Sequence, residues 1–271
     1  MNQAIGVIDS GVGGLTVASE LMRQLPKEQL IYLGDTLRCP YGPRSEMEIR
    51  KFTWEMVNFL LEKQIKILVV ACNTATAYTL SELHEELDIP VIGVIQPGAR
   101  AAINVTENNQ VGIIGTEATI KSEAYSRALN TIKEDIKSIS HACPSLVPLV
   151  EKGILKGDVA YNVVGKSLES INDKKLGLDT LILGCTHYPL LKQVIQDVLG
   201  HDIKIISSSE ETARETSTVL EMNDLLNKEE GIPTHLIYTT GELDNFKHLM
   251  NDVFKHHLGD IKNIKIEKAV L

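Results

Sequence analysis

Two stretches of the chain, 113 residues apart, share one pattern, and this repeat constrains the fold more than any other feature. Residues 67–71 form an apolar, strand-like run that ends at Cys72, and residues 180–184 form a similar run that ends at Cys185. In both stretches, small polar residues and then a helical pattern follow the cysteine. A strand followed by a helix is the repeating unit of α/β folds, so the repeat predicts two related halves.

Further strand-like runs alternate with helical patterns along both halves, which cover about residues 5–95 and 111–207. The runs lie at residues 5–8, 30–34, 90–95, 111–115, 136–140 and 202–207. Strands that alternate with helices favour mostly parallel sheets with helices on both faces. We therefore expect an α/β fold made of two similar, doubly wound domains.

Two late strand-like runs, at residues 235–240 and 264–267, lie beyond the second half. On their own they would form a unit too small to fold, so we expect them to pack onto the sheet of the first half. This makes the first domain discontinuous. We predict one domain from residues 1–97 and 208–271, and a second domain from residues 98–207.

The chain of 271 residues has 27 basic and 36 acidic side chains, which give a net charge of −9. This charge argues against nucleic acid and anionic membrane surfaces as the main partners. Residues 1–9 lack the basic region and long apolar core of a signal peptide, and no apolar run approaches the length of a transmembrane helix. With four cysteines and no export signal, we expect reduced thiols in the cytoplasm.

Several polar residues fall where the predicted strands end. In open α/β sheets, ligands bind beyond the carboxyl ends of the strands, so these residues are the candidates for a functional site. They are Asp9, Ser10, Cys72, Asn73, Thr116, Cys185, Thr186 and His187. If the two halves face each other, these side chains converge on one cleft.

Among these residues, Cys72 and Cys185 are the candidates for the chemistry itself. A single cysteine is usually a buried, inert side chain. These two differ because each lies between a strand and a helix N-terminus, where the helix dipole and free N–H groups favour a thiolate. They also occupy equivalent places in the two halves. Cys39 and Cys143, which lie in loops next to prolines, are interpreted as inert.

Asp9 has two interpretations. It either caps the following helix, or it tunes a nearby thiol or binds an ammonium group. The adjacent glycines favour the second interpretation, because they let the backbone come close to a ligand. They do not form a dinucleotide-binding fingerprint, since Thr16 stands where the third glycine belongs. There is no Walker A lysine either, so the sequence indicates no nucleotide cofactor.

Two further residues have more than one interpretation. His187, two residues after Cys185, is either a capping or core histidine or a residue that assists this thiol. Glu151 ends the otherwise apolar stretch 146–151 and, taken alone, is interpreted as a solvated helix residue. The spacing of the histidines and cysteines indicates no metal site.

Two opposed thiols without a cofactor motif indicate proton transfer at a carbon atom. One thiolate removes a proton and a thiol on the opposite face delivers another, so the same pair works in both directions. N–H groups and the side chains of serine, threonine and asparagine around a carboxylate would stabilise the carbanion-like transition state.

Five segments carry a closer resemblance. They are Asp9-Ser-Gly-Val-Gly-Gly-Leu15, Tyr32-Leu-Gly-Asp-Thr36, Pro40-Tyr-Gly42, Ala71-Cys-Asn-Thr-Ala75 and Leu183-Gly-Cys-Thr-His-Tyr-Pro-Leu-Leu191. In these segments, and over most of the chain from residue 5 to about 220, the sequence resembles the glutamate racemase family. Members of this family are cofactor-independent amino-acid racemases of bacterial peptidoglycan synthesis.

The resemblance implies two α/β domains related by pseudo-twofold symmetry, with the active site between them and neither metal nor cofactor. It implies Cys72 and Cys185 as the acid/base residues, one for each face of the glutamate Cα. Asp9 would assist Cys72, while His187 and Glu151 would assist Cys185. The residues implied to hold the substrate are Asp9, Ser10, Tyr41, Gly42, Asn73, Thr74, Thr116, Thr186 and His187. The resemblance also implies a homodimer.

Three alternatives remain open from the sequence. A related racemase that acts on aspartate or another small acid would use the same proton transfer between two thiols. A cysteine hydrolase would use one thiol as nucleophile and His187 as base, but it would leave the second cysteine without a role. A protein that binds an amino acid without catalysis would tolerate serine at both cysteine positions.

Overall fold

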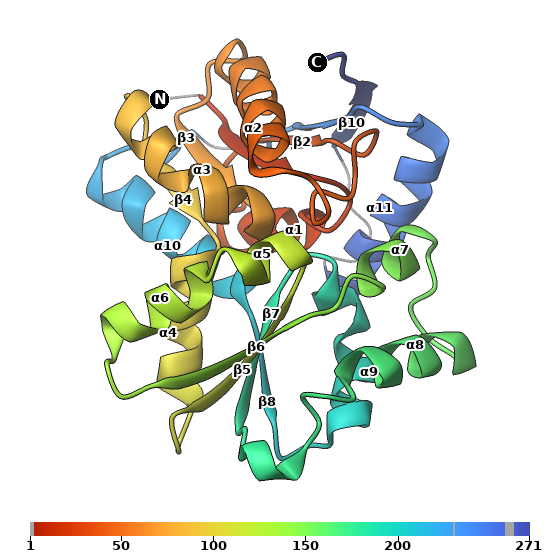
Figure 1. Ribbon diagram of the computed structural model, residues 1–271. Helices are drawn as coiled ribbons and strands as arrows, with labels where there is room; N and C mark the ends of the chain where they lie inside the picture. The colour runs from red at the N-terminus through yellow and green to blue at the C-terminus, as the bar shows by residue number, and fades with distance from the viewer. Residues whose placement is uncertain (1–2, 230, 258–262) are drawn as a thin grey trace.

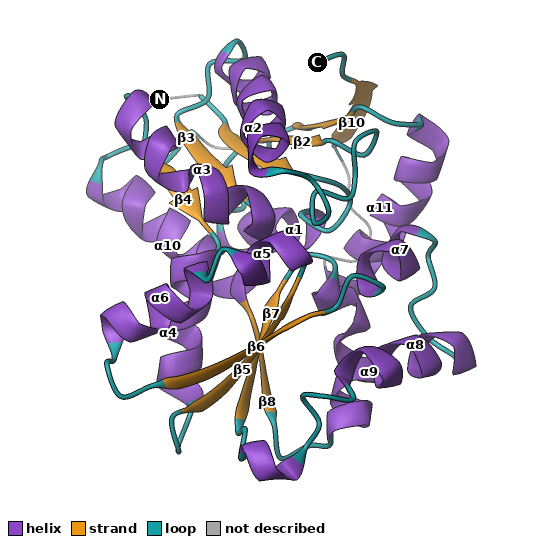
Figure 2. Cartoon of the chain, viewed as in Figure 1, coloured by secondary structure: helices purple, strands orange, loops and turns teal. Residues whose placement is uncertain are grey.

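The computed structural model describes residues 3–229, 231–257 and 263–271, which form two parallel sheets flanked by helices (Figure 1 and Figure 2). The first sheet has six strands in the order β10-β9-β2-β1-β3-β4, and the second has four in the order β6-β5-β7-β8. All pairings between these strands are parallel. This architecture confirms the predicted α/β class.

The strands of the first sheet are β1 (Ile5–Asp9), β2 (Leu30–Gly34), β3 (Ile67–Val70), β4 (Val91–Gly93), β9 (His235–Thr239) and β10 (Ile264–Lys268). Those of the second sheet are β5 (Gln110–Gly115), β6 (Lys137–Ala142), β7 (Thr180–Gly184) and β8 (Lys204–Ser207). The order β2-β1-β3-β4 corresponds strand for strand to β6-β5-β7-β8. The repeat seen in the sequence is therefore also a repeat of sheet topology.

The late strands β9 and β10 join the first sheet beside β2, as the sequence predicted. The exact domain boundaries, at residues 97/98 and 207/208, stay a prediction.

The chain crosses between the sheets twice, from β4 into helix α4 (Ile95–Val105) and from β8 into helix α10 (Ser208–Met222). These two helices pack against each other and therefore connect the halves.

Helices cover both faces of each sheet, so the central strands β1, β3 and β7 are buried along their whole length and are mostly apolar. The remaining helices are α1 (Leu15–Gln24), α2 (Glu46–Leu61), α3 (Asn73–Glu86), α5 (Glu117–Lys121), α6 (Ala124–Ile132), α7 (Leu146–Glu151), α8 (Asp158–Leu168), α9 (Lys192–Leu199) and α11 (Leu243–His257), with short 3₁₀ helices η1 (Lys174–Leu176) and η2 (Tyr188–Leu191). In the first half, α1 packs with α10 and α11, and α2 packs with α3. In the second, α4 packs with α6, and α8 packs with α9.

One predicted element differs from the structure. The sequence predicted a strand over residues 90–95. Instead β4 ends at Gly93, and α4 begins at Ile95 with Pro97 in its first turn. Proline is tolerated in a first turn, because the N–H group that it lacks has no partner within the helix there.

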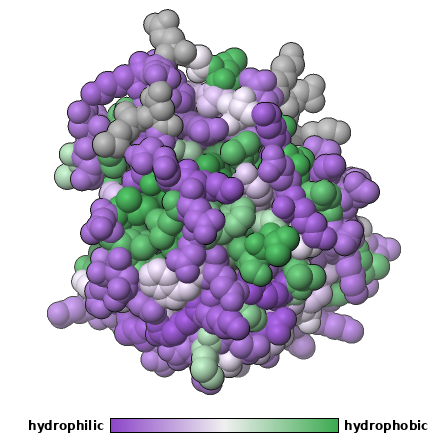
Figure 3. Space-filling model, turned by 90° about the horizontal axis from the view of Figure 1, so that it is seen from above, coloured by the Kyte–Doolittle hydropathy of each residue, from purple (hydrophilic) through white to green (hydrophobic). Residues whose placement is uncertain are grey.

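The surface seen from above is mostly hydrophilic, with apolar residues in separate patches (Figure 3). Within the described ranges, no helix combines the length and the apolar character that crossing a bilayer requires.

Candidate active site

Cys72 lies in the turn between β3 and α3 and is the N-cap residue of α3. Its Sγ accepts a hydrogen bond from the Ala75 N–H across 3.4 Å. Cys72 caps the helix because its extended backbone directs the sulfur to the first free N–H groups of α3. Asn73 and Thr74, which are better capping residues by type, begin the helix and leave their side chains for other contacts.

The Cys72 thiol is buried and lies 3.5 Å from Ser10 Oγ. Burial and the nearby Asp9 carboxylate raise the pKa of Cys72 to about 12, despite hydrogen bonds with Ser10 and Ala75. Cys72 is therefore a neutral thiol at pH 7.

Asp9, at the end of β1, has no exposed surface. Its carboxylate accepts hydrogen bonds from the Gly11 N–H at 2.9 Å and from Thr186 Oγ1 at 3.0 Å. Burial raises the pKa of Asp9 above its ordinary value, while the charge of His187 and hydrogen bonds from Gly14, Gly11 and Thr186 act to lower it. A Cβ at Gly14 would collide with the Asp9 side chain, so only glycine permits this close wrapping of the loop.

On the other side of the site, His187 lies between Cys185 and Glu151. Its Nδ1 is 3.8 Å from Cys185 Sγ, and its Nε2 is 2.6 Å from Glu151 Oε1. Burial would lower the pKa of His187, but contacts with Cys185, Cys39 and Glu151 raise it well above the usual value. Burial acts to raise the pKa of Glu151, but the hydrogen bond and charge of His187 lower it overall.

Glu151 corrects the interpretation that its sequence context gave when taken alone. It is not a solvated helix residue, because its side chain is only 24% exposed and is bound to His187. It also accepts a 3.4 Å hydrogen bond from the Val12 N–H of the first half. The structure thus gives Glu151 contacts on both sides of the cleft, which no local pattern encodes.

A small cavity of about 10 Å³ lies between the two cysteines and is lined by residues of both halves. Its walls are Ser10, Pro40, Tyr41, Gly42, Cys72, Asn73, Thr74, Thr116, Val147, Cys185, Thr186 and His187. The structure therefore brings together the residues that the sequence singled out, and Asp9 and Glu151 lie directly behind them through hydrogen bonds to Thr186 and His187.

Asn73 presents a free donor at this cavity. Tyr125, on α6, donates a hydrogen bond from its hydroxyl to Asn73 Oδ1 across 2.7 Å. The buried Asn73 Nδ2 has no hydrogen-bond partner among the residues that the structure describes. A buried donor without a partner is costly, so this amide is poised to bind an acceptor of a ligand. The sequence did not predict a role for Tyr125, because no motif lies in the residues next to it in the chain.

Thr74, Thr116 and Gly42, which are also candidates, contact one another. Thr74 Oγ1 lies 2.8 Å from Thr116 Oγ1, and a Cβ at Gly42 would come within 2.8 Å of the Thr116 Cβ. The Tyr41 hydroxyl donates its proton to Asp35 Oδ2 across 2.6 Å, so only its oxygen can bind a ligand, as an acceptor. Tyr41 lines the cavity without offering it an unused donor.

The two other cysteines differ from each other. Cys143 is buried and contacts the Ser167 carbonyl, as an inert cysteine would. Cys39 is half-buried, and its Sγ lies 3.6 Å from Glu151 Oε1. Cys39, Glu151 and His187 place three possible metal-ligand atoms within 4.8 Å of one another. The sequence did not predict this cluster.

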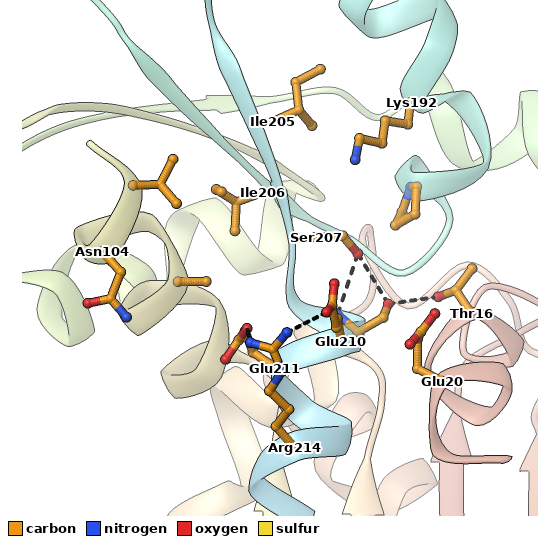
Figure 4. Close-up of a pocket in the computed structure, with 14 residues that line it drawn as sticks. Thr16, Glu20, Asn104, Lys192, Ile205, Ile206, Ser207, Glu210, Glu211 and Arg214 are labelled. Atoms are coloured by element: carbon orange, nitrogen blue, oxygen red, sulfur yellow. Dashed lines mark hydrogen bonds and ion pairs between the residues drawn. The ribbon is translucent and has the colours of Figure 1, made fainter. Parts of the chain in front are cut away.

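A second cavity, of about 480 Å³, lies behind the site among α1, α4, α9 and α10 (Figure 4). Neither Cys72 nor Cys185 lines it. Thr16 and Ser209, at one end, are joined by a 3.3 Å hydrogen bond, and Thr16 Oγ1 contacts the Thr186 carbonyl at 3.4 Å. At the other end, Arg214 forms ion pairs with Glu210 and Glu211.

Comparison with known proteins places the chain among amino-acid racemases. The family described as Asp/Glu/Hydantoin racemase matches residues 5–216. The glutamate racemase of Oceanobacillus iheyensis is 62% identical over 265 residues, which cover 98% of this chain and 96% of that protein. The crystal structure of glutamate racemase isoform RacE1 from Bacillus anthracis is 49% identical, with a TM-score of 0.92 over 99% of this chain and 98% of its own. The glutamate racemase of Francisella tularensis in complex with D-glutamate is 34% identical, with a TM-score of 0.89 over 100% of this chain and 97% of its own.

Proposed function

The chain belongs to the Asp/Glu/Hydantoin racemase family, and from this premise we propose that it interconverts L- and D-glutamate. Its relatives at 50–62% identity are glutamate racemases along nearly their whole length. An aspartate racemase homologue from Pyrococcus horikoshii has 16% identity and a TM-score of 0.53, so it shares the fold alone. These comparisons favour glutamate over aspartate as the substrate.

The observation that carries the proposed mechanism is that Cys72 and Cys185 line one cavity from opposite halves of the molecule. In this mechanism, one thiolate takes the Cα proton and becomes a thiol. The opposite thiol gives its proton to the other face of the carbanion and becomes a thiolate. No atom is gained or lost, but the two cysteines have exchanged protonation states. The enzyme is then ready for the reverse reaction, and proton exchange with solvent restores the first state. No step uses a metal or an organic cofactor.

Each thiol has a different neighbour for handling its proton. Cys72 lies near the Asp9 carboxylate, and Cys185 lies 3.8 Å from the imidazole of His187. We propose that His187 holds a proton beside the Cys185 thiolate, while Glu151 keeps the ring protonated and oriented. Asp9 is proposed to stabilise the substrate ammonium group next to Cys72. The N–H groups at the start of α3 favour the Cys72 thiolate once substrate is bound.

Substrate carboxylates are proposed to bind Asn73 Nδ2, Ser10 and the hydroxyl groups of Thr74, Thr116 and Thr186. A cavity of about 10 Å³ has room for about one water molecule, and glutamate is much larger. We therefore propose that the halves open to admit substrate and close around it, which excludes water from the carbanion.

The cellular setting is also part of the proposal. The resemblance to glutamate racemases supports a cytoplasmic enzyme that supplies D-glutamate for peptidoglycan and acts as a homodimer. Light scattering tests the dimer directly, since a monomer mass at micromolar concentration would contradict it.

The test of the function is to incubate the purified protein with L-glutamate, without added cofactor, and to follow optical rotation. The proposal predicts decay of the signal to zero. A parallel incubation with L-aspartate separates the nearest alternative, because faster decay with aspartate would overturn the substrate assignment. Absence of change with either amino acid would favour a hydrolase or a binding protein.

A further inference from the structure

We propose that Cys39, Glu151 and His187 form a binding site for a zinc ion, and that zinc bound there blocks the use of His187 in racemisation. The first part depends only on the cluster of side chains. The second part rests on the proposed function.

The three ligand atoms lie within 4.8 Å of one another beside Gly11. A Cβ built on Gly11 would lie 2.6 Å from Glu151 Oε1, 3.0 Å from Cys39 Sγ and 3.2 Å from His187 Nε2. Because glycine has no Cβ, the three side chains can approach one another here. Zinc binds oxygen and nitrogen at about 2.0–2.2 Å and sulfur at about 2.3 Å. Small rearrangements of these three side chains would therefore let one ion contact all three ligand atoms.

The donor set suits zinc better than the hard cations. Thiolate and imidazole ligands select borderline and soft metals, whereas magnesium and calcium prefer oxygen ligands. Three protein ligands leave a fourth, open position of the tetrahedron for water. The half-buried Cys39 and the 24% exposed Glu151 side chain give an ion access from solvent.

The groups around the ligands support the site. The Val12 N–H donates to Glu151 Oε1 and orients the carboxylate. His187 Nδ1 faces Cys185, so its Nε2 is the nitrogen directed to the cluster. When zinc binds, the Cys39 proton is released to solvent, and the metal replaces the proton that His187 and Glu151 share.

The consequence for Cys185 follows from the loss of the contact between His187 and Glu151. Zinc on Nε2 takes the place of the hydrogen bond between the ring and Glu151 Oε1. The ion then holds the ring, and Glu151 no longer positions it beside Cys185. Zinc is therefore expected to inhibit racemisation reversibly from a position beside the two catalytic thiols.

The binding test uses cobalt(II) as a spectroscopic substitute for zinc and needs no enzyme activity. In the full-length Cys72→Ser/Cys185→Ser variant, cobalt should give one equivalent of a thiolate-to-cobalt charge-transfer band, and zinc should displace it. Adding Cys39→Ser should abolish the band. A second variant, Gly11→Ala, keeps all three ligands but adds a Cβ that would lie 2.6 Å from Glu151 Oε1, and should also lose the band. A band that survives Cys39→Ser would overturn the site.

The activity test compares the wild-type protein with Cys39→Ser. Zinc should inhibit the wild-type protein, and EDTA should restore it. Relative to its own activity without zinc, Cys39→Ser should need at least about tenfold more zinc for half inhibition than the wild-type protein does. Equal zinc sensitivity would place the inhibitory ion on Cys72 or Cys185 and refute the inference. Cobalt binding by a protein that does not racemise glutamate would support the metal site while contradicting the proposed function.

Discussion

Thr186 Oγ1 donates a hydrogen bond to Asp9 Oδ1 across 3.0 Å, and this contact joins the surroundings of the two cysteines. Thr186 follows Cys185 in the second half, whereas Asp9 ends the central strand β1 of the first. Because Asp9 is fully buried, each donor to its carboxylate affects how readily that group stays charged. The two thiols are thus electrostatically linked as well as close.

The first prediction concerns this hydrogen bond. Thr186→Val removes the donor, so the pKa of Asp9 rises further and the charged form becomes rarer. A hydrogen bond to a charged group is worth about 1.5–3 kcal/mol, so we expect kcat/KM to fall roughly tenfold to a hundredfold. Thr186→Ser keeps the hydroxyl and should retain most activity. Equal loss in both variants would show that the methyl group, and not the donor, matters.

The second prediction concerns pH. The Glu151 contact helps to raise the pKa of His187, so Glu151→Gln should lower the pKa of the imidazole. The protonated form of His187 is then lost at lower pH, and the alkaline limb of the kcat/KM profile should move toward acid. Glu221→Gln, on the exposed surface of α10, is the matched control and should leave the profile unchanged. An unmoved profile in Glu151→Gln would contradict the proposed role.

The third prediction concerns Tyr125. Tyr125→Phe keeps the buried ring but leaves Asn73 Oδ1 without its donor, so the amide loses its fixed orientation. We expect KM for glutamate to rise several-fold while kcat changes less, because the amide is proposed to bind substrate and takes no part in proton transfer. Tyr161→Phe removes a hydroxyl that bonds to Asp197 on the surface and serves as the control. A fall in kcat with unchanged KM would refute this positioning role.

The fourth prediction concerns stability. Lys66 and Glu28 form a buried ion pair at 2.6 Å, and both contact the segment after α10 through the Leu225 carbonyl and the Asn227 N–H. Lys66→Met leaves the Glu28 charge buried and unpaired, so urea unfolding should show a loss of about 3–5 kcal/mol.

Two controls define that result. Lys66→Met combined with Glu28→Gln should recover part of the loss, because no unpaired charge remains. Lys51→Met, at the exposed Lys51–Glu55 pair, should cost at most about 1 kcal/mol. If the double variant were as unstable as the sum of the two single ones, the ion-pair explanation would fail.

Sequence alone predicted the elements whose pattern is local. The apolar runs at β1, β3, β5 and β7 are recognisable because strands buried on both faces are apolar throughout. The cysteines at the ends of β3 and β7 follow from the same runs. The internal repeat predicted two related halves, and the two sheets share one order of four strands. The pattern Ser45-x-x-Glu48 is typical of a capping box, and it forms one at the start of α2.

What sequence missed depends on contacts between distant segments. Helix α4 was hidden because Pro97 and Gly98 suggest a break, although a first turn tolerates proline. The sequence context of Glu151 indicated a surface residue until the fold placed it against His187 and Val12. Cys39 and Tyr125 reach the site from a loop and a helix that carry no chemical pattern of their own.

The central claim, that two thiols act on opposite faces of one carbon, is tested most directly by racemisation of L-glutamate in D₂O. Proton NMR follows the Cα–H signal while circular dichroism follows the configuration. At early times the D-glutamate formed should carry deuterium at Cα, and the remaining L-glutamate should retain its hydrogen, because the acid that delivers the new proton differs from the base that removed the old one. D-glutamate that keeps its original Cα hydrogen would contradict the two-thiol mechanism.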